Sequence, residues 1–597
     1  MTPYSAPVRD MRFVLDTVCD FDDLRQIDGF AEATPDLLDA VLDEAGKLSS
    51  GAIAPLNGVG DQQGSVLDNG SVRTPDGFKD AYRQYVDGGW NGLTFSPDYG
   101  GQGLPFALGV AVQEMWTSAN MSFSLCPMLN QGAVEAITAH GSDALKATYL
   151  PKMISGEWSG TMNLTEPQAG SDVGALKTKA EPADDGTWRI KGTKIFITYG
   201  EHDLTDNIIH LVLARTPGAP PGTKGISLFI VPKFLVGQDG SPGARNDVRC
   251  VSVEHKLGIH ASPTCVMSFG DEDACVGYLV GEENRGMAAM FTMMNHARVN
   301  VGLQGVAIAE RAYQQAVAYA RERVQSAEFG KRGDAVPIIR HADIRRTLMT
   351  MRAFIEGARA LTYLNAVAVD RGHHHPDGET RARWQGLADL LTPVTKGFAT
   401  DLGCELTSMA IQVHGGMGYV EETGAAQHFR DARIAPIYEG TNGIQALDLV
   451  GRKLGMDGGM HWKRLFGEIR DFTGDLPGGG DIGAIGPYLD DAVDALQNAA
   501  VWLAGNDLEH ARDTAAGAAP FLRMFGVTMS GYLLARQAVV AAQRLDAGQG
   551  DPAWLKAKIA TARFFAEQLM PPATALLGPI TRGDDMLFAL DEEQFAA

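Results

Sequence analysis

A block of strand-like sequence between two long helical regions is the feature that most limits how this chain can fold. Residues 187–200, TWRIKGTKIFITYG, alternate apolar and polar side chains. The runs at 208–217 and 225–234 are apolar, β-branched and bounded by Gly or Pro. Both patterns predict β-strands. We therefore expect a small β domain over residues 161–282, with helical sequence on either side of it.

Helical patterns precede and follow this block. In 37–48, LLDAVLDEAGKL, apolar residues recur at helical spacing, and Thr34 or Asp36 is the expected N-cap. From Gly286 onward the pattern is helical again, and the Gly-rich stretch 475–487 is the clearest linker. Because helices and strands occur in separate blocks, the predicted fold class is α+β rather than alternating βαβ. The expected divisions are a short extension (1–30) with a helical domain to residue 160, the β domain at 161–282, a helical bundle at 283–460 and a further helical block at 461–597.

Charge and cysteine content exclude several classes of protein. The 597 residues include 51 Lys and Arg against 73 Asp and Glu, so the net charge is −22. A nucleic-acid-binding protein normally shows a basic surplus, which is absent here. No apolar run approaches the ~18 residues of a membrane span, and residues 1–13 lack a signal-peptide pattern. Six cysteines without a CxxC pair argue against a structural zinc site and fit a reducing compartment, so we expect a cytoplasmic protein.

The common nucleotide, hydrolase and metal motifs are missing. The segments 101–106 and 416–421 both lack the last glycine of GxGxxG, and the sequence holds no GxxxxGK[ST], GxSxG or HExxH. The triplet His373–His375 lies next to Pro376 and is predicted to be a solvated loop rather than a metal site. The sequence thus predicts no metal site, no Rossmann site and no serine-hydrolase site.

Four segments point to one family. They are NLTEPQAGSDVG (163–174), KGTKIFITYG (191–200), QVHGGMGYVEE (412–422) and RDARIAPIYEGTNGIQ (430–445). Together, and in this order, they resemble the acyl-CoA dehydrogenase flavoprotein family over residues 40–455. That resemblance implies a helical N-terminal domain, a middle β domain, a C-terminal four-helix bundle and FAD as the cofactor. The opening YSAPVRDMRFVL and the added C-terminal helices resemble a long-form bacterial subgroup.

The resemblance also implies a reaction and a base. Such enzymes abstract the α-proton of an acyl-CoA and transfer the β-hydride to flavin, which yields a trans-2-enoyl-CoA. Glu439, in APIYEGTNG, is the candidate base, and desolvation would raise its pKa toward the working pH. On spacing alone, the favoured interpretation of Glu439 is a carboxylate that stabilises a helix N-terminus, and only the family motif points to a base. Some relatives place the base on an earlier helix, at the position of Ala297, which cannot accept a proton. The backbone N–H of Glu439 is the implied donor to the thioester carbonyl.

Other residues match the binding positions of the family. Phe196 occupies the usual Trp position. Without the resemblance, Thr198 would be interpreted as an ordinary strand residue and Arg323 as a solvated charge on a helix. The family uses the positions of Arg323, Gln412, Gly415 and Gly416 for the FAD of a neighbouring subunit. Asn295 and Arg298 lie three residues apart, on one face of a predicted helix. The implied cofactor-binding residues are Met162, Leu164, Thr165, Gly170, Ser171, Phe196, Thr198, Arg323, Gln412, Gly415, Gly416 and Thr441; the implied substrate-binding residues are Ser171, Asn295, Arg298 and Gly440.

Substrate and partners remain open at this stage. The resemblance implies 3-methylmercaptopropionyl-CoA, as in dimethylsulfoniopropionate breakdown, or a short- or medium-chain acyl-CoA, because a hydrophobic pocket separates such neighbours by only about 1–3 kcal/mol. A long-chain acyl-CoA is the alternative substrate. The implied electron acceptor is an electron-transfer flavoprotein, and the alternatives are an oxidase that uses oxygen or a flavin-free scaffold protein. A homo-oligomer, at least a dimer, is expected.

Overall fold

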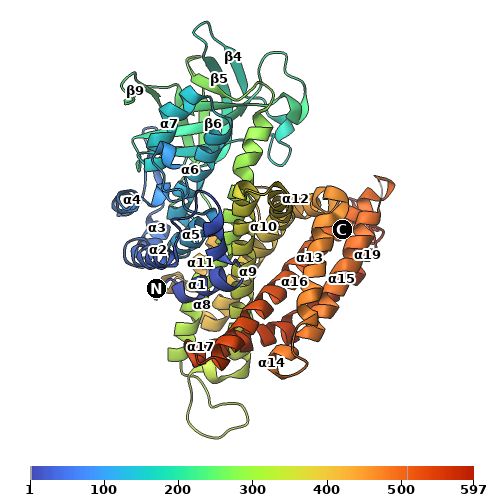
Figure 1. Ribbon diagram of the computed structural model, residues 1–597. Helices are drawn as coiled ribbons and strands as arrows, with labels where there is room; N and C mark the ends of the chain where they lie inside the picture. Colours follow the sequence, from blue (N-terminus) through green and yellow to red (C-terminus); the bar gives the residue numbers. More distant parts are fainter. Residues whose placement is uncertain (1–2, 507, 597) are drawn as a thin grey trace.

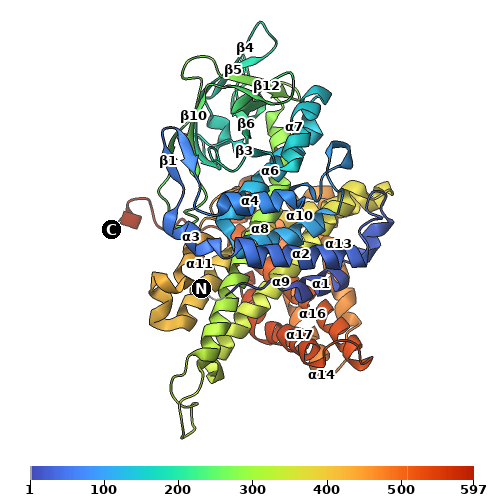
Figure 2. The same ribbon diagram turned by 90° about the vertical axis from the view of Figure 1, so that its left-hand side faces the viewer.

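Helices, then strands, then helices follow one another along the chain in the computed structural model, which describes residues 3–506 and 508–596. The strands gather at one end of the molecule, at the top of Figure 1, and the helices form the rest. Figure 2 shows the same division from the side. The predicted α+β class is confirmed.

Seven helices precede the sheet. Thr34 caps α2, since its hydroxyl accepts a hydrogen bond from the Leu37 N–H at 3.2 Å, as predicted. Residues 1–30, predicted as a short extension, form part of the folded body, because α1 buries Met11, Val14 and Leu15 completely. The helices are α1 (Val8–Thr17), α2 (Pro35–Leu48), α3 (Leu56–Gln63), α4 (Phe78–Asp87), α5 (Phe106–Ala119), α6 (Met121–His140) and α7 (Asp143–Ser155).

An eight-stranded sheet forms the middle of the chain. Its order is β10-β11-β5-β12-β7-β6-β3, with β4 added to β5, and all pairs are antiparallel except β3 with β6. The three runs predicted as strands are β5, β6 and β7. The strands are β3 (Trp158–Asn163), β4 (Lys179–Pro182), β5 (Trp188–Thr198), β6 (Asn207–Ala214), β7 (Ser227–Pro232), β10 (Val248–Val253), β11 (Thr264–Phe269) and β12 (Val276–Val280); two small hairpins pair β1 (Val66–Asp68) with β2 (Ser71–Arg73) and β8 (Phe234–Val236) with β9 (Pro242–Arg245).

Three long helices carry the chain away from the sheet. They are α8 (Gly286–Glu322), α9 (Ala342–His374) and α10 (Gly378–His414), and the short α11 (Ala425–Ala432) and α12 (Asn442–Asp448) follow. Both α9 and α10 pack along α8. His373 and His374 end α9 instead of lying in a loop, although both side chains are exposed as expected.

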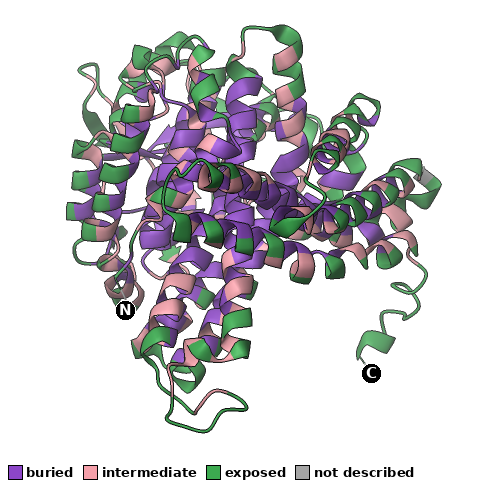
Figure 3. Cartoon of the chain, turned by 60° about the horizontal axis from the view of Figure 1, so that its bottom comes forward, coloured by how far each residue is buried: buried purple, intermediate pink, exposed green. Residues whose placement is uncertain are grey.

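The last helices form one body with the rest. They are α13 (Met460–Gly474), α14 (Gly480–Gly483), α15 (Gly486–Gly505), α16 (Ala511–Asp546), α17 (Pro552–Phe564), α18 (Pro571–Thr574) and α19 (Leu577–Thr581). The predicted linker at 475–487 contains only α14 and the start of α15. One hydrophobic core extends from Tyr4 to Ile580, and Figure 3 shows this buried interior running through the helices. In this core Phe565 meets Phe354 of α9 edge to face, with ring centroids 5.3 Å apart.

Candidate active site

Glu439 lies in the loop between α11 and α12. Its backbone φ is +57° and that of Gly440 is +81°, so two consecutive residues are left-handed. A non-glycine residue in this region stores strain and marks a position held by its surroundings. Thr441 caps α12, because its hydroxyl accepts a hydrogen bond from the Ile444 N–H at 3.3 Å. Glu439 therefore precedes the cap of the helix and is not part of its first turn.

Side chains of neighbouring residues hold this loop. Gln445 Nε2 donates to the carbonyl oxygens of Glu439 at 3.2 Å and Gly440 at 3.4 Å. The Asn442 N–H donates to the Pro436 carbonyl at 3.0 Å. By contrast, the hydrogen bonds found within residues 3–506 and 508–596 include none donated by the backbone N–H of Glu439. That N–H is therefore available to a ligand.

The electrostatic surroundings of Glu439 suit a base. Burial raises the pKa of its carboxyl above the usual value, and the positive charges of Arg298 and Lys396 oppose this rise. Arg298 of α8 is only 7% exposed, and its Nη1 lies 3.9 Å from Asp448 Oδ2. Its Nε is buried and has no hydrogen-bond partner in the described part of the chain. A raised pKa brings a carboxylate closer to the operating pH, where a general base is most effective.

The strand face expected to receive the flavin is assembled from β3, β5 and the turn after β3. The Ile195 N–H donates to the Thr165 carbonyl at 2.9 Å, which places the two segments side by side. Phe196 is 59% exposed and also left-handed, at φ +61°. Thr198 pairs with Thr264 at the edge of β11. Gly170 and Ser171 are exposed in the turn that follows Thr165.

A buried ion pair stiffens this face from behind. Lys194 Nζ lies 2.8 Å from Glu166 Oε1 and donates to the Leu164 carbonyl at 3.0 Å. Lys194 lowers the pKa of Glu166 to about 2, although burial alone would raise it. Leu164 and Met162 are half-buried and pack against the hydrophobic core.

Helix α6 connects the strand face with the Glu439 loop. The Tyr199 hydroxyl, next to Thr198, donates to the Ser122 carbonyl of α6 at 2.8 Å. Six residues along α6, about 9 Å at the helical rise, Met128 Sδ accepts a bond from Gln304 Nε2 of α8 at 3.4 Å. The Tyr438 hydroxyl, next to Glu439, donates to Gln304 Oε1. The strand face and the Glu439 loop are therefore both connected to α6, the strand face directly and the loop through Gln304 of α8.

A second group lies where α8 and α10 end. Arg323 follows the last turn of α8, and Gln412, Gly415 and Gly416 close α10; all four are exposed. The rings of Tyr319 and His414, one on each helix, have centroids 4.6 Å apart and join these ends. The four predicted residues thus lie at two helix ends that are in contact with each other.

The residues present fit FAD. Phe196 offers an exposed aromatic surface, and within the described chain the hydroxyls of Thr165 and Thr198 make no hydrogen bond. An ideal Cβ at Gly170, Gly415 or Gly416 would meet nothing within 4 Å, so a ligand can approach the backbone closely at these positions. Thr441, in contrast, uses its hydroxyl in the cap of α12. The side chain of Asn295 lies outside the described residues.

Sequence reasoning missed several residues around Glu439. Lys396 and Asn442 contact the loop directly, and Gln304 bonds to Tyr438. The one available signal was a lysine within the apolar helical run TPVTKGFATDL, since a buried lysine needs partners. No sequence pattern indicated that Phe329 is fully exposed in the arm between α8 and α9.

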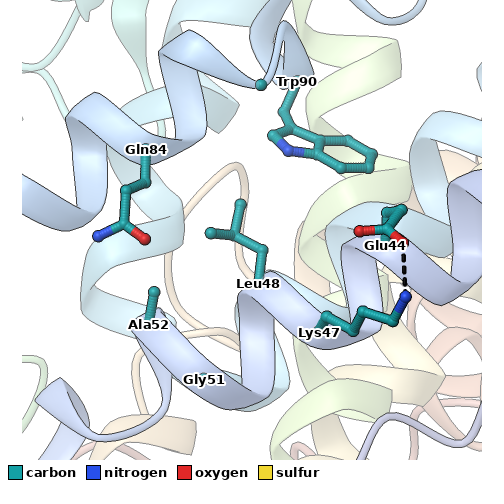
Figure 4. A pocket seen from close by; sticks show the side chains of 8 residues that line it. Glu44, Lys47, Leu48, Gly51, Ala52, Gln84 and Trp90 are labelled. Atoms are coloured by element: carbon teal, nitrogen blue, oxygen red, sulfur yellow. Dashed lines mark hydrogen bonds and ion pairs between the residues drawn. The ribbon is translucent and has the colours of Figure 1, made fainter.

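Two surface cavities lie elsewhere. One, of about 610 Å³, is lined by α2, α4 and Trp90, and Figure 4 shows the Glu44–Lys47 ion pair at its side. The other, of about 600 Å³, lies beside Tyr4 and Arg311. Neither is lined by Glu439. Within residues 3–506 and 508–596, no three His, Cys, Asp or Glu residues meet in a group suited to a metal ion, and no helix is long and apolar enough to cross a membrane.

Comparisons with known proteins agree with this geometry. Family models match four consecutive stretches: acyl-CoA dehydrogenase N-terminal domain at 68–157, middle domain at 161–271, C-terminal domain at 284–454, and acetyl-CoA dehydrogenase C-terminal like at 465–591. The chain is 49% identical to a 3-methylmercaptopropionyl-CoA dehydrogenase of Ruegeria pomeroyi, over 98% of this chain and 99% of that one. It is 37% identical to a butyryl-CoA dehydrogenase of Syntrophomonas wolfei, over 99% of each. The crystal structure of an acyl-CoA dehydrogenase from Bacillus anthracis, complexed with FAD, shares the fold at 21% identity and a TM-score of 0.75, over 95% of this chain and 91% of that one.

Proposed function

Since the chain belongs to the acyl-CoA dehydrogenase family, whose members are FAD-dependent oxidoreductases, we propose that Glu439 is the base that takes the α-proton of its acyl-CoA substrate. The observation that carries this proposal is a carboxyl of raised pKa on a strained loop, beside Arg298. The alternative position, Ala297, has no group that accepts a proton.

The chain's own groups account for the proton transfer. The α-proton of a thioester becomes acidic only when the carbonyl oxygen can take up negative charge, and the free backbone N–H of Glu439 is suited to donate to that oxygen. Arg298 favours the ionised form of Glu439 before the reaction. FAD, when bound, supplies the acceptor for the hydride that leaves the β-carbon. The product is a trans-2-enoyl-CoA.

The proposed cofactor contacts come from the strand face. Phe196, Thr198 and Thr165 border the ring, with Met162 and Leu164 behind them, and Gly170 and Ser171 approach a phosphate through the exposed turn. Gly440 and Arg298 are proposed to contact substrate. For Thr441 only the backbone is available, because its hydroxyl caps α12.

We place the second group, Arg323, Gln412, Gly415 and Gly416, on the FAD of a neighbouring subunit, so the enzyme is at least a dimer. The arm between α8 and α9 supports this, because it projects from the helical body at the bottom of Figure 1 and leaves the ring of Phe329 fully exposed. The arm is ordered by its own backbone bonds, from the Gln325 N–H to the Val336 carbonyl at 3.0 Å and from the Val336 N–H to the Ser326 carbonyl at 2.9 Å. An ordered arm with an exposed aromatic tip suits insertion into a partner.

For the substrate we favour a short acyl group, with 3-methylmercaptopropionyl-CoA first. The 49% identity to the Ruegeria pomeroyi enzyme supports this substrate. A structural argument also supports a short acyl group. The fully buried Gln304 is hydrogen-bonded to both Met128 and Tyr438, and it therefore forms a polar bridge next to the base. A long apolar chain would have to displace these hydrogen bonds.

Anaerobic bleaching of the enzyme-bound flavin by a series of acyl-CoA thioesters tests the function. We expect rapid bleaching by 3-methylmercaptopropionyl-CoA and butyryl-CoA, and slow bleaching by long-chain thioesters. Peroxide formation in air would indicate the oxidase instead of transfer to an electron-transfer flavoprotein. A colourless protein that binds no FAD would contradict the proposal.

Gln304→Ala is expected to extend the range of acyl chains. Removing the carboxamide removes the hydrogen-bonded bridge between Met128 and Tyr438. Because a longer acyl chain then displaces no hydrogen bonds, the ratio of kcat/KM for octanoyl-CoA to kcat/KM for butyryl-CoA should rise by about tenfold or more. Gln315→Ala is the matched control, because Gln315 lies on the same helix but bonds to Thr423 and His428. An unchanged ratio in Gln304→Ala would remove the structural argument for a short substrate.

A further inference from the structure

A buried lysine of α10 reaches the backbone directly after the proposed base. Lys396 has no exposed surface, and its Nζ donates to the Gly440 carbonyl at 2.8 Å and to Asn442 Oδ1 at 2.8 Å. Gly440 follows Glu439 and shares its left-handed conformation. The lysine therefore binds the strained part of the loop from the side of α10.

Asn442 extends this contact along α10. Its Nδ2 lies within hydrogen-bond distance of three acceptors on one face of the helix: Asp401 Oδ1 at 2.7 Å, Thr400 Oγ1 at 2.9 Å and the Gly397 carbonyl at 3.0 Å. Lys396, Gly397, Thr400 and Asp401 lie within about one and a half helical turns. The loop is thus fastened to a rigid helix rather than only to its own neighbours.

Lys396 also acts through its charge. Burial lowers its pKa to about 8, so the ammonium remains the main form at neutral pH. The charged groups that act on Glu439 and Lys396 are Arg298 of α8 and Asp401 of α10, and Arg298 lies 3.9 Å from Asp448 of α12. Among them Arg298 and Lys396 oppose the desolvation of Glu439, since a nearby positive charge favours the ionised carboxylate.

We propose that Lys396 is a positioning residue, which fixes the left-handed Glu439–Gly440 backbone through the Gly440 carbonyl and places a positive charge beside the Glu439 carboxylate. This inference rests on the proposed role of Glu439. It goes beyond that role because it predicts that one ammonium sets both the geometry and the titration of the base. A lysine that served only to fill the helix interface would affect folding but not the pH at which Glu439 works.

The test measures exchange of the α-proton of butyryl-CoA with deuterated solvent, using the anaerobic holoenzyme across a pH series. Exchange requires the base but no net transfer of electrons. In Lys396→Met the pH midpoint of exchange should move upward by about one unit or more, because the ionised form of Glu439 has lost a positive neighbour. The kcat should fall by about 10-fold to 100-fold, while KM changes much less.

Lys558→Met is the matched control. Lys558 is also buried, 2% exposed, but it pairs with Asp10 and Glu356 in a different part of the molecule. It should lower stability without moving the exchange midpoint. If Lys396→Met does not fold, Asn442→Ala removes the bonds of the Asn442 side chain to Lys396 and Asp401 but leaves the Lys396–Gly440 bond. Because it loosens the loop and keeps the ammonium, it should lower the exchange rate without moving the exchange midpoint.

Two results would overturn the inference, and both differ from failure of the proposed function. One is an exchange midpoint in Lys396→Met equal to that of the unaltered enzyme, with kcat within twofold. The other is an equal shift in Lys558→Met, which would reflect a general loss of packing. Failure of the proposed function would instead appear in the unaltered enzyme, as an absence of exchange with butyryl-CoA and with 3-methylmercaptopropionyl-CoA.

Discussion

Glu439→Gln is expected to lower the rate of flavin reduction by substrate by at least about a thousandfold. Glutamine has nearly the same shape but cannot accept the α-proton at its amide. Because the backbone N–H of residue 439 is unchanged, acyl-CoA should still bind, and because the strand face is untouched, the protein should remain yellow. Anaerobic stopped-flow absorbance of the flavin, mixed with butyryl-CoA, measures the rate.

Glu422→Gln provides the control for this substitution. Glu422 is an exposed acid in the segment that precedes α11. Its substitution removes one negative charge from the chain, as Glu439→Gln does. Its reduction rate should equal that of the unaltered enzyme. Reduction of Glu439→Gln at the original rate would show that another group takes the proton, and the roles of both Glu439 and Lys396 would then be wrong.

The sequence predicts the strands, from alternating apolar and polar side chains, and the candidate base, from the motif around Glu439. It does not predict the residues that hold the Glu439 loop in place. Strand β5 follows directly from its period of two, and Thr34 was one of the two predicted caps, with Asp36, because capping is local. Lys396 and Gly440 are 44 residues apart, and their contact depends on how α10 packs beside the loop. Local patterns carry no information on such a pairing.

The two ends of the chain show the same limit. Residues 1–30 were predicted to be a short extension and 461–597 an added helical block, the latter with a Gly-rich linker at 475–487. In the structure α1 and α17 pack into the core of the central helices, and Lys558 pairs with Asp10, 548 residues away. The apolar face of α1 was visible in the sequence, but its partner was not.

Arg359→Met is expected to cause the largest loss of stability. Arg359 of α9 is 1% exposed and donates to three carboxylates: Asp10 at 2.7 Å, Glu114 at 2.6 Å and Glu310 at 2.9 Å. Methionine fills part of the volume but leaves these buried carboxylates without their shared cation. Removing one partner of a buried ion pair costs about 3–5 kcal/mol. Urea unfolding followed by circular dichroism, at neutral pH and fixed protein concentration, measures the difference.

Arg9→Met separates burial from the mere number of ion pairs. Arg9 also joins α1 to the region of α17, through Asp551 at 3.1 Å, but both side chains are 50% exposed. Because water and salt screen such a pair, its loss should cost about 1 kcal/mol or less. Equal destabilisation by the two substitutions would mean that α1 is held by its apolar face alone. If Arg359→Met has a much larger effect and the flavin spectrum of the folded protein is unchanged, the buried Arg359 is what holds α1, α5 and α8 to α9.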